Sequence, residues 1–106
     1  MKKSNGTTGP PLFPLGKLVT TRGALAACSP HYLDYLSRHA RGDWGRVSAQ
    51  DAARNRKAVT QGGRIRSAYP IDPEEPCNGS GKNTLWIITE ADRRATTLLL
   101  PEEDEC

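Results

Sequence analysis

The spacing of apolar residues is helical in the first part of the chain and strand-like in the second. Between residues 30 and 40 the apolar positions recur every three or four residues, as on one face of an amphipathic helix. The stripe consists of Tyr32, Leu33, Leu36 and Ala40. Ser29 can accept a hydrogen bond from a free amide at the helix start, Pro30 suits the first helical position, and Gly42 suits a left-handed C-cap. The pattern predicts a helix from Pro30 to about Ala40.

A second helix is predicted between Ser48 and Gly62. Ser48 followed three residues later by Asp51 approximates a capping box, and the Gly62-Gly63 pair stops the helix. The apolar stripe is thin, with Ala49, Ala52, Ala53 and Val59 as its members. Because so few positions are apolar, the basic side chains of this segment must project largely outward.

Strand signals begin after Gly63. Residues 65–71 alternate between apolar and polar positions, as in a strand with one wet face, whereas residues 85–88 are continuously apolar, as in a central strand. Residues 95–100 supply a third strand that Pro101 terminates, and Asp72 to Asn83 forms a mobile loop. Near the N-terminus, Lys17 to Thr21 is a short segment with β-branched residues, which is typical of a strand. Thr21 can then cap a short helical stretch over residues 23–28.

The order of these elements indicates an α+β fold, in which a small helical layer packs on a three- to four-stranded, mainly antiparallel sheet. With 106 residues, one hydrophobic core and one domain are expected. We place this domain at residues 15–101. Residues 1–14, rich in glycine, threonine and proline, are expected to form a flexible tail, and residues 102–106 an acidic tail.

Composition narrows the environment of the protein. No apolar run approaches the roughly 18 residues needed to span a bilayer, and the N-terminal residues do not resemble a signal peptide, so we expect a cytoplasmic protein with no membrane partner. Cys28, Cys77 and Cys106 are scattered and odd in number, which favours reduced thiols over disulfides or a structural zinc site. His31 and His39 do not converge on one helix face and are interpreted as surface histidines. No metal or cofactor is expected.

The net charge of +3 conceals an uneven distribution. Residues 1–66 hold twelve basic and three acidic side chains, whereas residues 67–106 hold three basic and nine acidic ones. The densest basic group is Arg54, Arg56, Lys57, Arg64 and Arg66. This group can contact phosphates, and Tyr69 or Trp86 can stack on bases if exposed, although aromatic residues in strands are more often part of the core. Mutual solvation of the two charged halves is the simpler interpretation.

A second polar group surrounds the last predicted turn. Its members are Glu90, Asp92, Arg93 and Arg94. Carboxylate and guanidinium groups can act together on a phosphodiester, but a salt-bridged hairpin turn explains the same residues. Residues 79–82, Gly-Ser-Gly-Lys, resemble part of a phosphate-binding loop, yet Pro76 and Asn83 break the full motif and a strand follows, so a flexible linker is the better interpretation.

Several motifs together resemble the small bacterial "plasmid-related" protein family of mobile genetic elements. The motifs are Leu15-Gly16 through Thr21-x-Gly23-Ala24-Leu25, Arg38-His39-x-x-Gly42-Asp43-Trp44-Gly45, Ser67-Ala68-Tyr69, and Trp86-Ile87-Ile88-Thr89-Glu90-Ala91-Asp92-Arg93-x-x-Thr96-Thr97. The resemblance covers roughly residues 15–103 and implies a setting on plasmids, integrated elements and phages, with no catalytic residues to carry over.

From that setting we expect a non-catalytic accessory protein that binds a host or element protein or a nucleoprotein, for example as an inhibitor of host defence. The tentative binding residues are the five basic residues and the four residues of the last turn. Two alternatives stay open, a nucleic-acid-binding regulator and a ribonuclease similar to the RelE toxins, the latter by analogy of fold alone.

Overall fold

A four-stranded sheet with the strand order β1-β4-β3-β2 forms the centre of the fold. The computed structural model describes residues 10–27 and 32–104. Along the chain, the elements are β1 (Lys17–Thr20), α1 (Arg22–Ala27), α2 (Tyr32–Ala40), α3 (Ala49–Gln61), β2 (Ile65–Pro70), β3 (Thr84–Thr89), β4 (Ala95–Leu99) and the 3-10 turn η1 (Pro101–Glu103). Strands β2, β3 and β4 are antiparallel neighbours, and β1 runs parallel to β4. The predicted α+β class and the mainly antiparallel sheet are confirmed.

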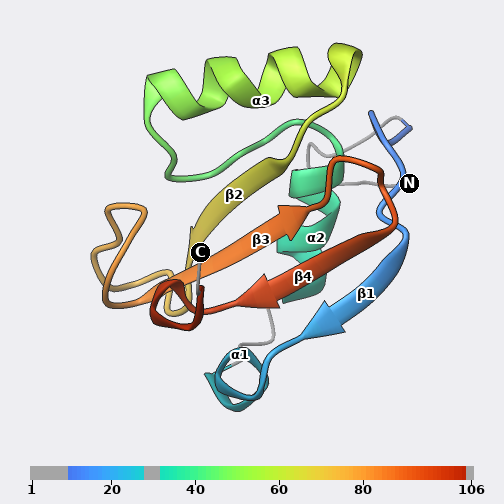
Figure 1. The fold of residues 1–106 in the computed structure, drawn as a ribbon. Coiled ribbons are helices and arrows are strands. Elements are labelled where there is room, and N and C mark those ends of the chain that lie inside the picture. The colour runs from blue at the N-terminus through green and yellow to red at the C-terminus, as the bar shows by residue number, and fades with distance from the viewer. Residues whose placement is uncertain (1–9, 28–31, 105–106) are drawn as a thin grey trace, which may run out of the picture.

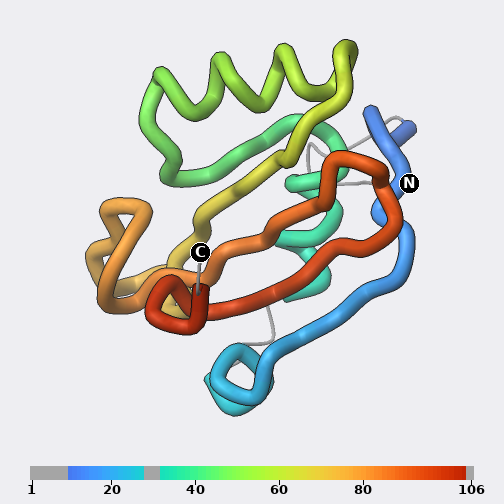
Figure 2. The backbone as a smooth tube through the Cα atoms, viewed as in Figure 1, coloured from blue at the N-terminus to red at the C-terminus, as the bar shows by residue number. Residues whose placement is uncertain are grey.

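The helices cover the sheet unevenly. Helix α2 lies across one face of the sheet, α3 runs beside β2, and α1 continues from the end of β1 (Figure 1). The backbone trace shows that β1 and β4 lie side by side although they are far apart in the sequence (Figure 2). The connection from β3 to β4 and the connection from α3 to β2 are both short. Each of these strands therefore lies next to the element that precedes it.

The predicted caps form wherever the structure describes them. The Ser48 hydroxyl accepts a hydrogen bond from the Asp51 amide at 3.0 Å, and the Thr21 hydroxyl accepts one from the Ala24 amide at 3.1 Å. Gly62 ends α3 with a φ of 84° while its amide donates to the Ala58 carbonyl. Left-handed φ values favour glycine, so this stop follows directly from the residue type. The predicted helix start at residues 29–30 lies outside the described residues.

Helix α2 buries two of the four predicted stripe residues, Leu36 and Ala40. Its buried residues are Tyr35, Leu36, His39 and Ala40, whereas Tyr32 and Leu33 are exposed. The Tyr35 ring stacks on Tyr69 of β2, with ring centroids 4.5 Å apart and an interplanar angle of 6°. This aromatic pair fixes the rotation of the helix, because turning Leu33 inward moves Tyr35 away from the sheet.

The folded region starts before residue 15, in contrast to the boundary that we predicted. Phe13 is buried in a cluster with Trp44 of the loop before α3, Ala58 of α3 and Ile65 of β2. The Leu12 amide also donates to the Ala40 carbonyl at 2.7 Å, which fastens this segment to the end of α2. Residues 10–14 therefore belong to the domain, while the rest of the predicted N-terminal tail lies outside the described residues.

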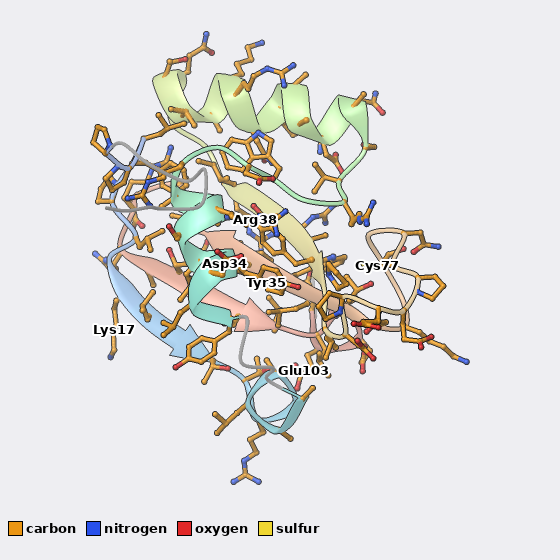
Figure 3. The ribbon with its side chains drawn as sticks, turned by 180° about the vertical axis from the view of Figure 1, so that it is seen from behind. Lys17, Asp34, Tyr35, Arg38, Cys77 and Glu103 are labelled. Carbon is orange, nitrogen blue, oxygen red and sulfur yellow. The ribbon has the colours of Figure 1, made fainter. Side chains whose placement is uncertain are left out.

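The first part of the predicted acidic tail also contacts the domain. Glu103 in η1 accepts hydrogen bonds from the Thr21 hydroxyl, from the Gly23 amide at 3.0 Å and from the Leu100 amide at 2.9 Å. These hydrogen bonds lower the pKa of the Glu103 carboxyl, and the bond from the Thr21 hydroxyl has the largest effect. Figure 3 places Glu103 beside α1. A carboxylate near the first turn of a helix complements its free amides, so Glu103 fixes α1 to the end of β4.

The loop over residues 72–83 is held by its own hydrogen bonds. The Asn83 side chain accepts from the Asp72 amide at 2.8 Å and donates to the carbonyls of Asp72, Glu75 and Pro76, each at 3.1 Å. Further along, the Gly79 carbonyl accepts a hydrogen bond from the indole nitrogen of Trp86. The loop thus has a defined internal arrangement, which the sequence did not indicate.

Candidate functional site

The five basic residues singled out in the sequence come from two neighbouring elements. Arg54, Arg56 and Lys57 lie on α3, and Arg64 and Arg66 lie just before and within β2. We call this set the basic surface. Its members are exposed, except that Arg66 is half-buried. The structure therefore places the predicted group on two segments that lie side by side (Figure 1).

One inward side chain of α3 sets the orientation of the basic surface. Asn55 is buried, its amide nitrogen donates to the Arg66 carbonyl at 2.8 Å, and its amide oxygen accepts from the Arg66 backbone N–H at 3.2 Å. Ala58, one turn later, is buried against Ile65 and Phe13. With these two positions turned inward, Arg54, Arg56 and Lys57 must point away from the core.

A shared carboxylate holds two of the arginines. Asp51 forms ion pairs with Arg54 at 2.9 Å and with Arg66 at 3.1 Å, through different oxygens. These three residues, with Asn55 and Arg64, line a hollow of about 170 Å³ between α3 and β2. The exposed ion pairs add little stability. Their effect is to hold guanidinium groups at the rim of a small polar hollow.

The basic surface keeps an excess of positive charge. Glu90 lies 4.0 Å from Arg64, and together with Asp51 it is the acidic partner of this surface among the described residues. Arg56 and Lys57 form no ion pair with any described residue. Five cations thus face two carboxylates. Such a surface attracts polyanions, and guanidinium groups match the geometry of phosphate oxygens.

The two aromatic residues near the basic surface, Tyr69 and Trp86, are covered by other parts of the protein. Tyr69 is fully buried in the core. Trp86 is half-buried on the sheet face opposite α2, and the Arg66 guanidinium carbon lies 4.4 Å from the centroid of its ring. Neither ring is available for base stacking, so this part of the chain can contact phosphates but has no stacking platform.

The four polar residues of the β3–β4 turn do not converge on one point. Glu90 turns toward Arg64, while Asp92 accepts a hydrogen bond from the Arg94 amide and pairs with its side chain at 3.6 Å. Arg93 instead donates to the carbonyls of Gly63 at 2.6 Å and Ala58 at 2.7 Å. These contacts match the interpretation as a structural hairpin turn and leave no acid-base pair facing one shared substrate position.

Arg93 therefore fastens the end of α3 to the β3–β4 turn. Replacing it by glutamine removes charge-assisted hydrogen bonds to the carbonyls of Gly63, Ala58 and Glu90, and we expect the free energy of unfolding to fall by about 2 kcal/mol. Urea denaturation measures this change. Arg94→Gln is the matched control, because the Arg94 side chain is 85% exposed, and we expect this variant to be nearly neutral. Equal effects of the two substitutions would contradict a structural role specific to Arg93.

Sequence reasoning missed a buried polar network. His39, which we interpreted as a surface residue, is fully buried between the hydroxyls of Ser67 at 2.5 Å and Thr89 at 2.9 Å. Thr89 contacts the Thr96 hydroxyl at 2.7 Å, and Thr96 donates to the Leu15 carbonyl at 2.7 Å. Burial lowers the pKa of His39 to about 3, so the imidazole is neutral. The alternation that places residues 65, 67 and 69 on one strand face was the available signal for Ser67.

This network is structural. The contact between His39 and Ser67 resembles a base and its nucleophile, but no carboxylate is hydrogen-bonded to the imidazole and both residues are shielded from solvent. Within residues 10–27 and 32–104, no three His, Cys, Asp or Glu side chains lie close enough to hold a metal ion. Cys77 in the loop after β2 is an unpaired thiol, while Cys28, His31 and Cys106 lie outside the described residues (Figure 3).

Comparison with known proteins assigns neither a family nor a function to this chain. No protein-family model matches the chain, and no curated protein and no solved structure matches it. None of the helices in the described part of the chain has the length and apolar character needed to cross a membrane.

Proposed function

We propose that this chain is a non-catalytic accessory protein that binds a nucleoprotein target, and that its basic surface contacts the phosphates of the nucleic acid. The proposal takes its setting, a mobile genetic element in the bacterial cytoplasm, from the motifs that resemble the plasmid-related family. Nucleic acid is favoured over a wholly protein target at this surface because of one observation. Four exposed cations and the half-buried Arg66 lie on α3 and at the start of β2, and two carboxylates oppose them.

The arrangement favours contact with the backbone over reading of the bases. The positive charge lies along a helix of 13 residues, and both nearby aromatic rings are covered. We therefore expect binding that is largely independent of sequence and falls steeply with salt. If three to five phosphates are contacted, the logarithm of the association constant should fall with the logarithm of salt concentration with a slope of about −3 to −4.5.

The test replaces the α3 cations. In Arg54→Gln/Arg56→Gln/Lys57→Gln, we expect affinity for a short labelled DNA duplex at low salt to drop on the order of 30-fold, and the salt slope to become shallower by about 2 to 3. Fluorescence anisotropy over a salt series measures both quantities. None of these three side chains is buried, so the fold should persist.

The matched control carries the same change in net charge elsewhere. Lys17→Gln/Arg22→Gln/Lys82→Gln removes three exposed cations that lie outside the basic surface. This variant should retain most of the duplex affinity. Equal losses in the two triple variants would show unspecific attraction by net charge, and no binding by the natural chain at low salt would refute the proposal. Cleavage of RNA by the natural chain that is lost in Glu90→Gln would establish the ribonuclease alternative instead.

A further inference from the structure

The two edges of the sheet differ in whether their outward main-chain groups have hydrogen-bond partners. At the β2 edge, every outward main-chain group from Arg66 to Pro70 has a partner. Arg66 is bonded through both its N–H and its carbonyl to the Asn55 side chain, and Ala68 is bonded on both sides by the segment Trp44–Arg46. The Pro70 carbonyl accepts from the Tyr35 hydroxyl at 2.8 Å, and proline has no N–H to satisfy. This edge is closed to further pairing.

Gly45 is the residue that allows this closure. It pairs with Ala68 in a parallel bridge and has a φ of 74°. A side-chain carbon at this position would stand 2.1 Å from the Ala68 carbonyl oxygen. Only glycine permits so close an approach, and the closure of the β2 edge is therefore built into the sequence.

The β1 edge is open. The Lys17 amide donates to the Arg94 carbonyl and the Thr21 amide to the Leu98 carbonyl, each at 3.0 Å, so the odd-numbered residues of β1 face β4. Because main-chain groups alternate in direction along a strand, Leu18 and Thr20 direct their N–H and carbonyl groups outward. No other described residue pairs with these groups, and no described element lies beyond β1 (Figure 1).

The side chains of β1 fit an added strand. All four residues are exposed, and Leu18 and Val19, which point to opposite sheet faces, keep 52% and 39% of their surface accessible. A neighbouring strand would cover both side chains in addition to bonding the free main-chain groups. Main-chain bonds supply affinity in strand addition, and alternate side chains supply specificity.

Charge indicates the chemistry of the strand that fits. Lys17 at the start of β1 and Arg22 just after it are exposed, and neither forms an ion pair with a described residue. Antiparallel pairing of two β1 strands about Val19 would set Lys17 of one copy opposite Thr21 of the other, so Lys17 of one copy and Arg22 of the other would gather at each end of the pair. Like charges across a strand pair are unfavourable, whereas acidic side chains would neutralise both cations.

We propose that the open β1 edge binds an extended, acidic segment of a protein partner, which adds to the sheet as a fifth strand beside β1. The site is separate from the basic surface, which lies beside the opposite edge strand, so one target can engage both. A nucleoprotein, with phosphates and an acidic protein segment, offers the two chemistries together. The strand addition itself does not depend on the nucleic-acid contact.

Amide hydrogen exchange tests the proposal at single residues. In the free chain, the amides of Leu18 and Thr20 should exchange rapidly, whereas those of Val19 and Thr21, bonded to β4, should be protected. The probe is a blocked peptide of alternating glutamate and valine, compared with one of alternating lysine and valine. The glutamate peptide should slow exchange at Leu18 and Thr20 at least about tenfold, and the lysine peptide should not.

Two variants of one residue provide the matched comparison. Leu18→Pro removes the outward N–H, which no β4 group uses, while Leu18→Thr keeps it. We expect the proline variant to lose at least about tenfold in affinity for the glutamate peptide and the threonine variant to retain it. Retention of the Val19 and Thr21 protection would show that β1 is still paired with β4 in the proline variant.

Three results would overturn the proposal. Protection of Leu18 and Thr20 in the free chain at all concentrations means that another segment of the same chain covers the edge. Protection that grows with protein concentration means that a second copy does so. Equal effects of the two peptides, or none from either, mean that the edge does not select an acidic strand.

Discussion

Tyr69→Ala is expected to lower the free energy of unfolding by about 3 to 5 kcal/mol, the usual cost of deleting a large aromatic side chain from a core. Tyr69 is fully buried and stacks on Tyr35, and the Arg38 guanidinium carbon lies 5.0 Å from its ring centroid. Its hydroxyl also donates to the Asp43 carbonyl at 2.5 Å. Removing the ring abolishes the contact that orients α2 on the sheet. Urea denaturation followed by circular dichroism measures the change.

Two further substitutions divide this effect into parts. Tyr69→Phe keeps the ring and loses the hydrogen bond to Asp43, so its cost should be about 1 kcal/mol. Trp86→Ala should cost less than Tyr69→Ala, although tryptophan is larger, because Trp86 is half-buried and lies on the other face of the sheet. A larger loss in Trp86→Ala than in Tyr69→Ala would contradict this assignment of the main core.

Acidification is expected to destabilise the protein through His39. The pKa of His39 is lowered by burial from 6.5 to about 3, so the folded chain does not bind a proton at this site until well below the pH at which the unfolded chain does. The contribution of the neutral imidazole to the free energy of unfolding is fully present above about pH 6.5 and is lost as the pH falls toward 3. From about pH 7 to about pH 4.5, the expected contribution of this group is a loss of about 2.5 kcal/mol.

The His39→Gln variant isolates this contribution. Glutamine does not titrate, so its free energy of unfolding should depend less on pH over this interval, even though the substitution itself lowers stability. Nuclear magnetic resonance of the imidazole gives an independent measure of the pKa. A pKa of His39 near the ordinary value, or the same pH dependence in both proteins, would contradict a buried neutral imidazole.

Much of the fold could be predicted because short-range chemistry decides it. Ser48 and Gly62 set both ends of α3 through local hydrogen bonds and backbone conformation, and the apolar run in residues 85–88 identified β3 as the central strand. The buried face of α2 could be predicted only in part, because Tyr32 and Tyr35 are neighbours three residues apart on the helix and either can turn an aromatic ring to the sheet. Only Tyr69, which is distant in sequence, selects between them.

The candidate site was predictable to a similar extent. The basic surface follows from a helix with few apolar residues, so the grouping of Arg54, Arg56 and Lys57 was visible in the sequence. The role of Arg93 was not, because its partners are backbone carbonyls at Gly63 and Ala58, and every residue carries such a group. The open β1 edge was equally invisible, since it depends on which strand lies next to β4.

The parallel pairing of β1 with β4 has a consequence for how the chain folds during synthesis. Strand β1 emerges from the ribosome early, but its main-chain partners emerge only after β2 and β3, and the Thr21 contact with Glu103 spans 82 positions. The hairpins of β2, β3 and β4 can form locally, whereas β1 must wait for a long loop to close. Until then, both sides of β1 are free to pair with a neighbouring nascent chain, which exposes this strand to misassembly.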